Sequence, residues 1–234
     1  MPSAATLRAS IETQIPSAFA VYQRPEQRSI PTGIPQIDSV TAGVPISTLT
    51  EICGSGLASS GKTTVMISLL AQATQKYFCT LVDANDSFDP SSARVAGVNF
   101  SRLLWVRCGK NQSKLKPMEQ AFKTTDMLLQ SGGFGLLVVD LSSLSERLVR
   151  KVPMTTWFRF SRVVEKQRAA LVFLSQQPHA TSCAGLVLHL KANPAMWSGN
   201  LLEQFQLEAE VVRSREKKPT QSAKPNFFVP LQWA

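Results

Sequence analysis

The clearest chemical signal in this sequence is a glycine-rich run with the spacing G-x-x-x-x-G-K-[ST], namely Gly56-Leu57-Ala58-Ser59-Ser60-Gly61-Lys62-Thr63. In a turn between a strand and a helix, the backbone N–H groups of such a run can surround a phosphate, and the helix dipole favours negative charge there. The Lys62 ammonium can reach the outer phosphates, the Thr63 hydroxyl can coordinate Mg²⁺, and Thr64 would help to seat the inner phosphate. The run predicts a site for ATP and Mg²⁺. The alternative is a Gly- and Ser-rich turn that precedes a lysine by chance.

A second candidate for this site is Asp140, the carboxylate that ends the apolar run 136–140. Proteins with a phosphate loop of this kind hold the metal-side acid downstream on another strand. A single strand-end aspartate more often caps a turn, but its position well downstream of the glycine-rich run favours the ligand. We therefore predict that Thr63 and Asp140 share the Mg²⁺ ion.

The elements that must position these residues follow from apolar runs that alternate with helical patterns, which is typical of a sheet with crossover helices. Strands are predicted at 47–53, 78–83, 103–108, 136–140, 170–175, 185–190, 207–213 and 226–231, and helices at 62–76, 116–131 and 155–168. Three of the strands are nearly continuous apolar runs, as expected for strands covered on both faces. The fold class is therefore α/β, with a mostly parallel central sheet flanked by helices.

Length and composition favour one large domain, because 234 residues with 44% apolar content can bury a sizeable core. We expect the domain to occupy residues 29–234, preceded by a segment, 1–28, in which a short helix can be drawn over 5–14. The stretch 214–225 is rich in Lys, Ser and Pro, so we expect a mobile basic loop there.

The net charge of +9 is concentrated in two segments. Residues 144–168 carry seven Lys or Arg and two Glu, a net +5, and residues 213–224 carry five Lys or Arg and one Glu, a net +4. A concentrated basic surface favours polyanions, with nucleic acid ahead of membrane. The alternative is a solvated face that only improves solubility.

Other site classes find little support in the sequence. The four cysteines have no CxxC spacing and no histidine at ligand distance, which argues against a zinc site and fits a reducing cytoplasm. No apolar run approaches the length that a membrane span needs, so we expect no membrane partner.

Several blocks of the sequence, taken in order, resemble the RecA recombinase superfamily. They are 30–38 (IPTGIPQID), 50–54 (TEICG), 59–64 (SSGKTT), 82–90 (VDANDSFDP) with Ala93, Arg94 and Gly97, 138–140 (VVD) and 173–176 (FLSQ). The resemblance implies a RecA-like nucleotide-binding core and covers most of the chain. We see no counterpart of the separate C-terminal domain of RecA.

The resemblance also implies roles for particular positions. Asp89 would face the adenine, and Gln176 would sense the terminal phosphate. Arg213 and Arg215 fall where RecA filaments place a pair of lysines that reach the nucleotide of a neighbouring subunit, so they could stabilise charge in trans. The alternative for this pair is the solvated basic end of a strand.

The departures from RecA bear on hydrolysis. Asn85 occupies the position of the catalytic glutamate, and an amide cannot accept a proton from an attacking water. Asp86 is adjacent and could compensate, although successive side chains point in different directions. Ser92 replaces the aromatic residue that stacks on adenine, which should weaken nucleotide affinity. The segments that correspond to the two DNA-binding loops also look short.

A shortened RecA core with altered catalytic and loop positions resembles the ImuA-type accessory proteins of mutagenic translesion synthesis. That resemblance implies a bacterial cytoplasmic protein, with association with the nucleoid as an option. Its partners would be a RecA filament or a mutagenic polymerase complex, and single-stranded DNA and further copies of the chain stay open as partners. The alternatives are a DNA-dependent ATPase of recombinational repair, and an interaction module or cell-division inhibitor with a relic phosphate loop.

The segment 157–162 interleaves aromatic and basic residues, which could stack bases and hold phosphates. Helical spacing instead predicts that Trp157, Phe160 and Val164 share one face and enter the core. Arg159, Arg162 and Lys166 would then line another face and stay available to a polyanion or a protein.

Overall fold

The computed structural model describes residues 28–54, 60–108, 116–193, 196–198, 201–215 and 226–230, together with Thr6 and Thr13. The short helix drawn over 5–14 and most of the loop expected over 214–225 lie outside the described residues. The division of the chain at residues 28 and 29 stays a prediction.

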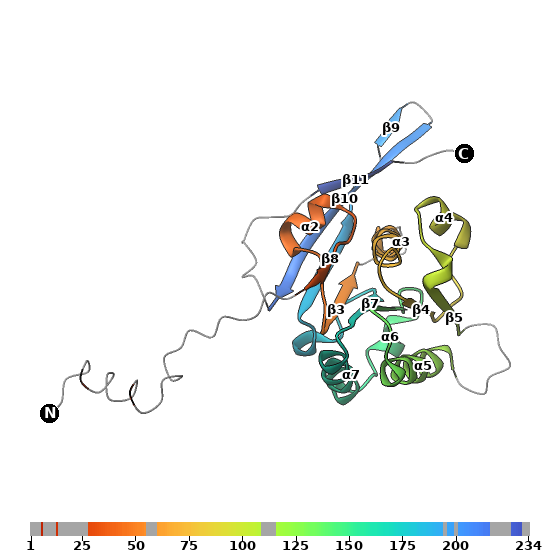
Figure 1. The fold of residues 1–234 in the computed structure, drawn as a ribbon. Helices are drawn as coiled ribbons and strands as arrows, with labels where there is room; N and C mark the ends of the chain where they lie inside the picture. The colour runs from red at the N-terminus through yellow and green to blue at the C-terminus, as the bar shows by residue number, and fades with distance from the viewer. Residues whose placement is uncertain are drawn as a thin grey trace.

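The fold is built on a nine-stranded sheet in the order β11-β10-β8-β3-β7-β6-β4-β5, with β9 paired to β10 outside this path (Figure 1). The strands are β3 Thr48–Cys53, β4 Cys79–Asp83, β5 Leu103–Arg107, β6 Leu136–Asp140, β7 Ala170–Ser175, β8 Leu186–Ala192, β9 Met196–Ser198, β10 Leu201–Ser214 and β11 Asn226–Pro230. Strands β8 to β5 run parallel, whereas β10 is antiparallel to β8, β9 and β11. The predicted α/β fold with a mostly parallel sheet is confirmed.

Helices cover both faces of the sheet (Figure 1). They are α2 Pro35–Thr41, α3 Lys62–Ala73, α4 Pro90–Val95, α5 Pro117–Ser131, α6 Glu146–Val149 and α7 Met154–Gln167, with single 3-10 turns η1 Phe100–Arg102 and η2 Thr181–Cys183. Helices α2, α3 and α4 lie on one face, and α5 and α7 lie on the other. A parallel sheet covered in this way explains why its strands are apolar on both sides.

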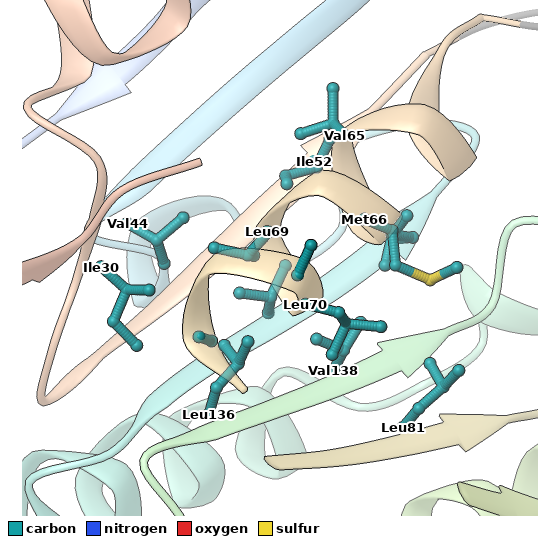
Figure 2. Close-up of a cluster of buried hydrophobic side chains, with 14 of the residues drawn as sticks. Ile30, Val44, Ile52, Val65, Met66, Leu69, Leu70, Leu81, Leu136 and Val138 are labelled. Atoms are coloured by element: carbon teal, nitrogen blue, oxygen red, sulfur yellow. The ribbon is translucent and has the colours of Figure 1, made fainter. Parts of the chain in front are cut away.

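Alternate residues of the central strands supply two separate cores. In β6, Leu136 and Val138 join the core under α3, whereas Leu137 and Val139 join the core under α5 and α7. Figure 2 shows the first of these cores, in which side chains of α3 lie over those of the central strands. All five residues of β6 are buried, so this strand has no solvent-facing side.

Aromatic side chains fill the second core. Phe173 of β7 lies 4.9 Å from Trp157 and 5.8 Å from Phe160 between ring centroids, and both α7 residues are at most 1% exposed. Phe122 of α5 stacks against the Phe160 ring. Together with the buried Val164, these contacts confirm the predicted inward face of α7 and show that Trp157 and Phe160 are not available to bases.

Sequence patterns located the long elements within a few residues, but they missed several short ones. The hairpin of β1 Ser29–Ile30 and β2 Val44–Pro45, and the helices α2, α4 and α6, were not predicted. Elements of two to seven residues are too short to show a period. Strand β10 is also longer than predicted, since it begins at Leu201 rather than 207.

Truncating one buried methyl group in the central strand tests the core under α3. Ile52 in β3 is 1% exposed (Figure 2), so we expect Ile52→Val to lower the free energy of unfolding by about 1 kcal/mol. Urea denaturation measures this change. The matched control is Val95→Ala in α4, where the side chain is 79% exposed and the expected effect is below about 0.5 kcal/mol. Equal losses in the two variants would contradict the packing described.

Candidate functional site

Four parallel strands end together at one edge of the sheet and bring the predicted site residues close to one another. Cys53 at the end of β3 pairs with Ser175 of β7, and Asp83 of β4 pairs with Asp140 of β6. In open α/β sheets, ligands bind outside the carboxyl ends of the strands. This edge is therefore the candidate nucleotide site.

The glycine-rich run connects β3 to α3 at this edge. Residues 55–59, which include the predicted Gly56 and Ser59, lie outside the described residues, whereas Ser60 is buried at 4% exposure. Gly61 precedes α3 with φ of 79°, and a Cβ at Gly61 would lie 2.3 Å from a methyl carbon of Leu207. A Cβ at Gly54 would lie 2.7 Å from the carbonyl oxygen of Leu190. Glycine is therefore favoured at Gly61 by its positive φ, and at Gly54, just before the run, by the close approach of the β8 backbone.

Lys62 is the first residue of α3, and its side chain reaches back to Gly54 after β3. Its Nζ donates a hydrogen bond to the carbonyl oxygen of Gly54 at 2.6 Å, and the residue is only 8% exposed. Burial lowers the pKa of the Lys62 ammonium, and the carboxylate of Asp140 opposes that shift. Thr63 is exposed and Thr64 is half-buried in the first turn of the helix. The first turn of α3 thus presents an ammonium and two hydroxyls near the strand ends.

Asp140 lies at the end of β6 and is 6% exposed. Its Oδ1 accepts hydrogen bonds from the backbone N–H and the hydroxyl of Ser142, so it does cap the following turn. Burial raises the pKa of the Asp140 carboxyl, while these hydrogen bonds and Lys62 lower it. Among the described residues, no hydrogen bond is made to the second carboxylate oxygen, and the proximity of Lys62 suits a metal-side acid.

Asp83 on the neighbouring strand has a different role. Its carboxylate accepts from the backbone N–H groups of Asn85 at 3.2 Å, Ser87 at 3.1 Å and Phe88 at 2.9 Å. These bonds hold the turn that follows β4. Asp83 therefore fixes the position of Asn85, whose side chain is exposed beside the site.

Asp86 is held by an ion pair. Its two carboxylate oxygens bind Nε and Nη2 of Arg107, the second at 2.7 Å, and its backbone has φ of 60°. The Arg107 guanidinium also lies over the Trp105 ring, 4.9 Å from its centroid. A carboxylate engaged at both oxygens by a guanidinium is a poor base. The arrangement argues against Asp86 as the replacement for the missing glutamate.

Asp89 is the N-cap of α4. Its carboxylate accepts from the backbone N–H groups of Ser91 at 3.1 Å and Ser92 at 2.9 Å, and the Ser92 hydroxyl bonds to it as well. These hydrogen bonds lower the pKa of Asp89. Asp89 and Ser92 are exposed, and capping the helix accounts for the position of Asp89 without a ligand. The contact of Asp89 with adenine stays a prediction.

Gln176 follows β7 and reaches across to the turn after β6. Its Nε2 donates to the carbonyl oxygens of Ser142 and Leu144, each at 3.2 Å. Since Ser142 also bonds to Asp140, one turn connects the predicted sensor to the predicted metal ligand. The structure thus brings together Lys62, Asp140 and Gln176 from three separate strands and loops.

Glu51 is a further charged residue near this edge, where a carboxylate could either assist Mg²⁺ or play a structural role. It is 0% exposed in the middle of β3, and its carboxylate accepts from the N–H groups of His179 at 2.7 Å and Ala180 at 3.0 Å and from the Ser175 hydroxyl at 3.2 Å. The segment after Gln176 is therefore tied to the strand that enters the glycine-rich run. These three contacts favour the structural role. The signal in the sequence was a charged residue inside a strand that is otherwise buried.

Burial raises the pKa of Glu51, although its hydrogen bonds lower it, so the folded protein holds this proton more tightly than the unfolded chain does. Between the pKa of Glu51 in the unfolded chain and its raised pKa in the folded protein, the folded state binds more protons than the unfolded state. The free energy of unfolding therefore falls as the pH rises through this window. We expect Glu51→Gln to flatten this fall in the range that begins near pH ~4.3, the ordinary glutamate value. Urea denaturation across that range measures it.

The control for this prediction is Glu165→Gln, which alters an exposed glutamate on α7. It should leave the pH dependence as in the unaltered protein. Part of the fall in the free energy of unfolding with pH should remain in Glu51→Gln, because the raised pKa of Asp140 also lowers this free energy as the pH rises. An unchanged slope in Glu51→Gln would show that Glu51 does not titrate in this way.

The predicted polyanion residues lie away from the phosphate site of their own chain. On β10, Arg213 is six residues from Leu207, which touches Gly61, so the two positions are about 20 Å apart. Arg213 and Arg215 donate to the carbonyl oxygens of Thr181 and Ser182 at 3.3 and 3.0 Å. Neither arginine can reach the nucleotide site of its own chain, so a role there requires a second subunit.

The basic face of α7 is exposed as predicted. Arg159, Arg162 and Lys166 are all exposed, and Arg159 lies 3.5 Å from Asp126 of α5. Among the described residues, no helix is long and apolar enough to cross a membrane.

The residues at the strand ends fit a nucleotide and a divalent cation. Gly54 and Gly61 are closely packed, Lys62 reaches back to the Gly54 carbonyl oxygen, and Asp140 is buried, so these residues bring an ammonium and a carboxylate to the strand ends. Such a set suits phosphate oxygens and Mg²⁺, which prefers oxygen ligands and keeps several waters.

Comparison with known proteins places the chain in a family. A model of the RecA N-terminal domain matches residues 20–152, more than half of the chain. Protein RecA of Rickettsia canadensis is 34% identical over 129 residues, which are 53% of this chain and 35% of that protein. Protein RecA of Brucella anthropi is 37% identical over 118 residues, 49% of this chain and 30% of that protein.

Protein RecA of Paramagnetospirillum magneticum is 40% identical over 99 residues, 42% of this chain and 25% of that protein. The chain thus matches no more than about a third of the length of these relatives. The matched region contains the glycine-rich run, Lys62, Asn85 and Asp140. On the family match and the RecA-like fold, the chain belongs to the RecA N-terminal domain family.

Proposed function

We propose that this chain is an ATP-binding accessory protein of the RecA type with weak or no ATP hydrolysis. One observation carries the proposal. The Lys62 side chain lies at the end of β3 with its ammonium close to Asp140, whereas the residue that corresponds to the RecA base is an amide, Asn85, and the nearest acid in sequence, Asp86, is paired with Arg107.

Nucleotide binding would rest on the first turn of α3. Ser60, Gly61 and Lys62 would hold the phosphates, together with Gly56 and Ser59, and Thr64 would seat the inner phosphate. Thr63 and Asp140 would hold the Mg²⁺ ion, whose charge would offset that of the phosphate oxygens. Gln176 would respond to the terminal phosphate, because its amide already bonds to the turn that holds Asp140.

Weak hydrolysis would follow from the missing base. General-base catalysis contributes about 10²–10⁴-fold to a rate, and it requires a group that accepts a proton near the attacking water. The Asn85 amide cannot do so. Binding without turnover would suit a protein whose nucleotide controls an interaction rather than a reaction.

The wider role that we propose is in the DNA damage response, specifically mutagenic translesion synthesis. It rests on the resemblance of this RecA-like chain, with its altered base position, to ImuA-type proteins. The partner would be a RecA filament or a mutagenic polymerase complex in the bacterial cytoplasm, and single-stranded DNA and further copies of the chain are candidate ligands. Arg213 and Arg215 support the oligomeric option, because they lie too far from the nucleotide site of their own chain.

The first test combines two measurements. Titration with a fluorescent ATP analogue and Mg²⁺ measures binding, and phosphate release from ATP with and without single-stranded DNA measures turnover. Binding without stimulated release is the expected result. Release stimulated by DNA would instead identify a DNA-dependent ATPase, and absence of binding would identify an interaction module with a relic phosphate loop.

A second test addresses the partner. Co-sedimentation with RecA filaments assembled on single-stranded DNA should retain the chain in an ATP-dependent manner. DNA alone, without RecA, is the control for direct DNA binding. Failure to sediment with filaments would exclude the RecA filament as the partner and leave the polymerase complex.

A further inference from the structure

We infer that the outer side of α7 is a docking surface for an acidic protein segment that carries large apolar side chains. The surface consists of Met154, Phe158 and Arg162, called here the α7 stripe, and of Arg213 and Arg215 beside it. It extends the proposed function by assigning a place for a protein partner, and its geometry does not depend on the nucleotide site.

The α7 stripe contains apolar side chains that the core does not use. The inward face of α7 already supplies Trp157, Phe160 and Val164, each at most 1% exposed. Met154 and Phe158 are nevertheless 39% and 45% exposed. Residues four apart lie on the same side of a helix, so Met154, Phe158 and Arg162 form one continuous stripe.

Contacts with η2 fix where the stripe lies. The Thr181 hydroxyl contacts the Met154 sulfur at 3.9 Å, and the Ser161 hydroxyl donates to the Cys183 carbonyl oxygen at 3.1 Å. Phe158 is four residues from Met154 and three from Ser161, so it neighbours the side of α7 that contacts η2.

The arginines of β10 border the same segment. Arg213 donates to the carbonyl oxygen of Thr181, the residue that also contacts Met154, and Arg215 donates to that of Ser182. These backbone carbonyls hold the two guanidinium groups beside the apolar stripe.

The charge of the surroundings indicates what fits. Arg147, Arg150 and Lys151 precede the stripe and are all exposed, and the segment 144–168 carries a net +5. A complementary ligand must bring both negative charge and apolar surface. An acidic amphipathic helix meets both needs, since its apolar side chains recur at the same i, i+4 spacing as Met154 and Phe158.

Nucleic acid fits this surface less well. Single strands bind on successive exposed aromatic rings, each of which stacks a base. Here Trp157 and Phe160 are buried, so Phe158 is the exposed ring of α7, and its neighbour on the stripe is a methionine. A flexible thioether is typical of surfaces that pack against other proteins.

Fluorescence anisotropy with three probes tests the proposal. The first probe is a labelled helical peptide of glutamates and leucines, about 15 residues or four turns long, with leucines at i, i+4 spacing. The second has serine in place of leucine, and the third is a labelled oligothymidylate. We expect binding of the Leu/Glu peptide, and at least tenfold weaker binding of the Ser/Glu peptide.

Variants place the binding on α7. Phe158→Ser should weaken binding of the Leu/Glu peptide about tenfold. The control is Phe78→Ser, which alters a 59% exposed phenylalanine outside this surface and should leave peptide binding unchanged. Arg162→Glu should weaken binding of the Leu/Glu peptide and create binding of a matching peptide with lysines in place of glutamates. The control, Arg94→Glu on α4, should change neither. Circular dichroism verifies that each variant is folded.

Lys62→Ala should retain peptide binding, which separates this proposal from the nucleotide site. Three results would overturn it: no binding of the Leu/Glu peptide, equal binding by Phe158→Ser, or selective loss of oligothymidylate binding in Phe158→Ser. The last result would assign the surface to nucleic acid.

Discussion

Replacing Lys62 with alanine should weaken the binding of ATP and Mg²⁺ by about two orders of magnitude, which corresponds to about 2.7 kcal/mol. Lys62 is 8% exposed and its Nζ lies 2.6 Å from the Gly54 carbonyl oxygen, so its charge lies in a poorly solvated position at the end of β3. A charge in such a poorly solvated position interacts strongly with phosphate. Titration with the fluorescent ATP analogue measures the loss.

Lys76→Ala is the matched control, because Lys76 is exposed in the turn after α3 and should not contact the nucleotide. Thermal unfolding of Lys62→Ala should match that of the unaltered protein within a few degrees, since the lysine is desolvated and its loss removes a buried charge. Undiminished nucleotide binding by Lys62→Ala would mean that the glycine-rich run is not the site.

Replacing Asn85 with glutamate should raise phosphate release by about 10²-fold, the lower range of general-base catalysis. Asn85 is held beside the site by its backbone N–H bond to Asp83, and its exposed side chain can be exchanged without disturbing the core. The new carboxylate would accept the proton that the amide cannot. Phosphate release at saturating ATP and Mg²⁺, with and without single-stranded DNA, measures the gain.

Two variants make this result specific. Asn85→Gln has the length of glutamate without the charge and should leave the rate unchanged. Arg107→Met breaks the ion pair with Asp86, so a higher rate in this variant alone would identify Asp86 as a latent base. If neither Asn85→Glu nor Arg107→Met raises the rate, the missing base is not what limits hydrolysis.

The sequence predicted the fold class because the signal was local and repeated. The strands β6 and β7 were predicted at their observed bounds, since each is an apolar run that ends at a polar residue. The spacing around Lys62 predicted the phosphate loop for a similar reason, because all of its parts are consecutive. Helix α3 begins at Lys62 as predicted, though it ends at Ala73.

The sequence patterns did not predict contacts between residues far apart in the chain. The ion pair of Asp86 with Arg107 joins residues 21 positions apart, and the Glu51 bonds to His179 and Ala180 span more than 120 positions. Propensity and periodicity describe neighbours along the chain, whereas these pairs form only once parallel strands from distant segments are aligned. The sequence could therefore raise Asp86 as a candidate base but could not reveal its partner.

What the sequence by itself determined was the class of the fold, and it also supplied two predictions, the phosphate loop and Asn85 at the position of the base. Each depends on residue type or on spacing along the chain. What only the tertiary structure decided was availability: Trp157 and Phe160 are buried, Asp86 is paired, and Arg213 lies about 20 Å from the glycine-rich run of its own chain. The physical reason is that burial, pairing and distance are set by the packing of β10, α7 and the parallel strands, and no local pattern encodes that packing.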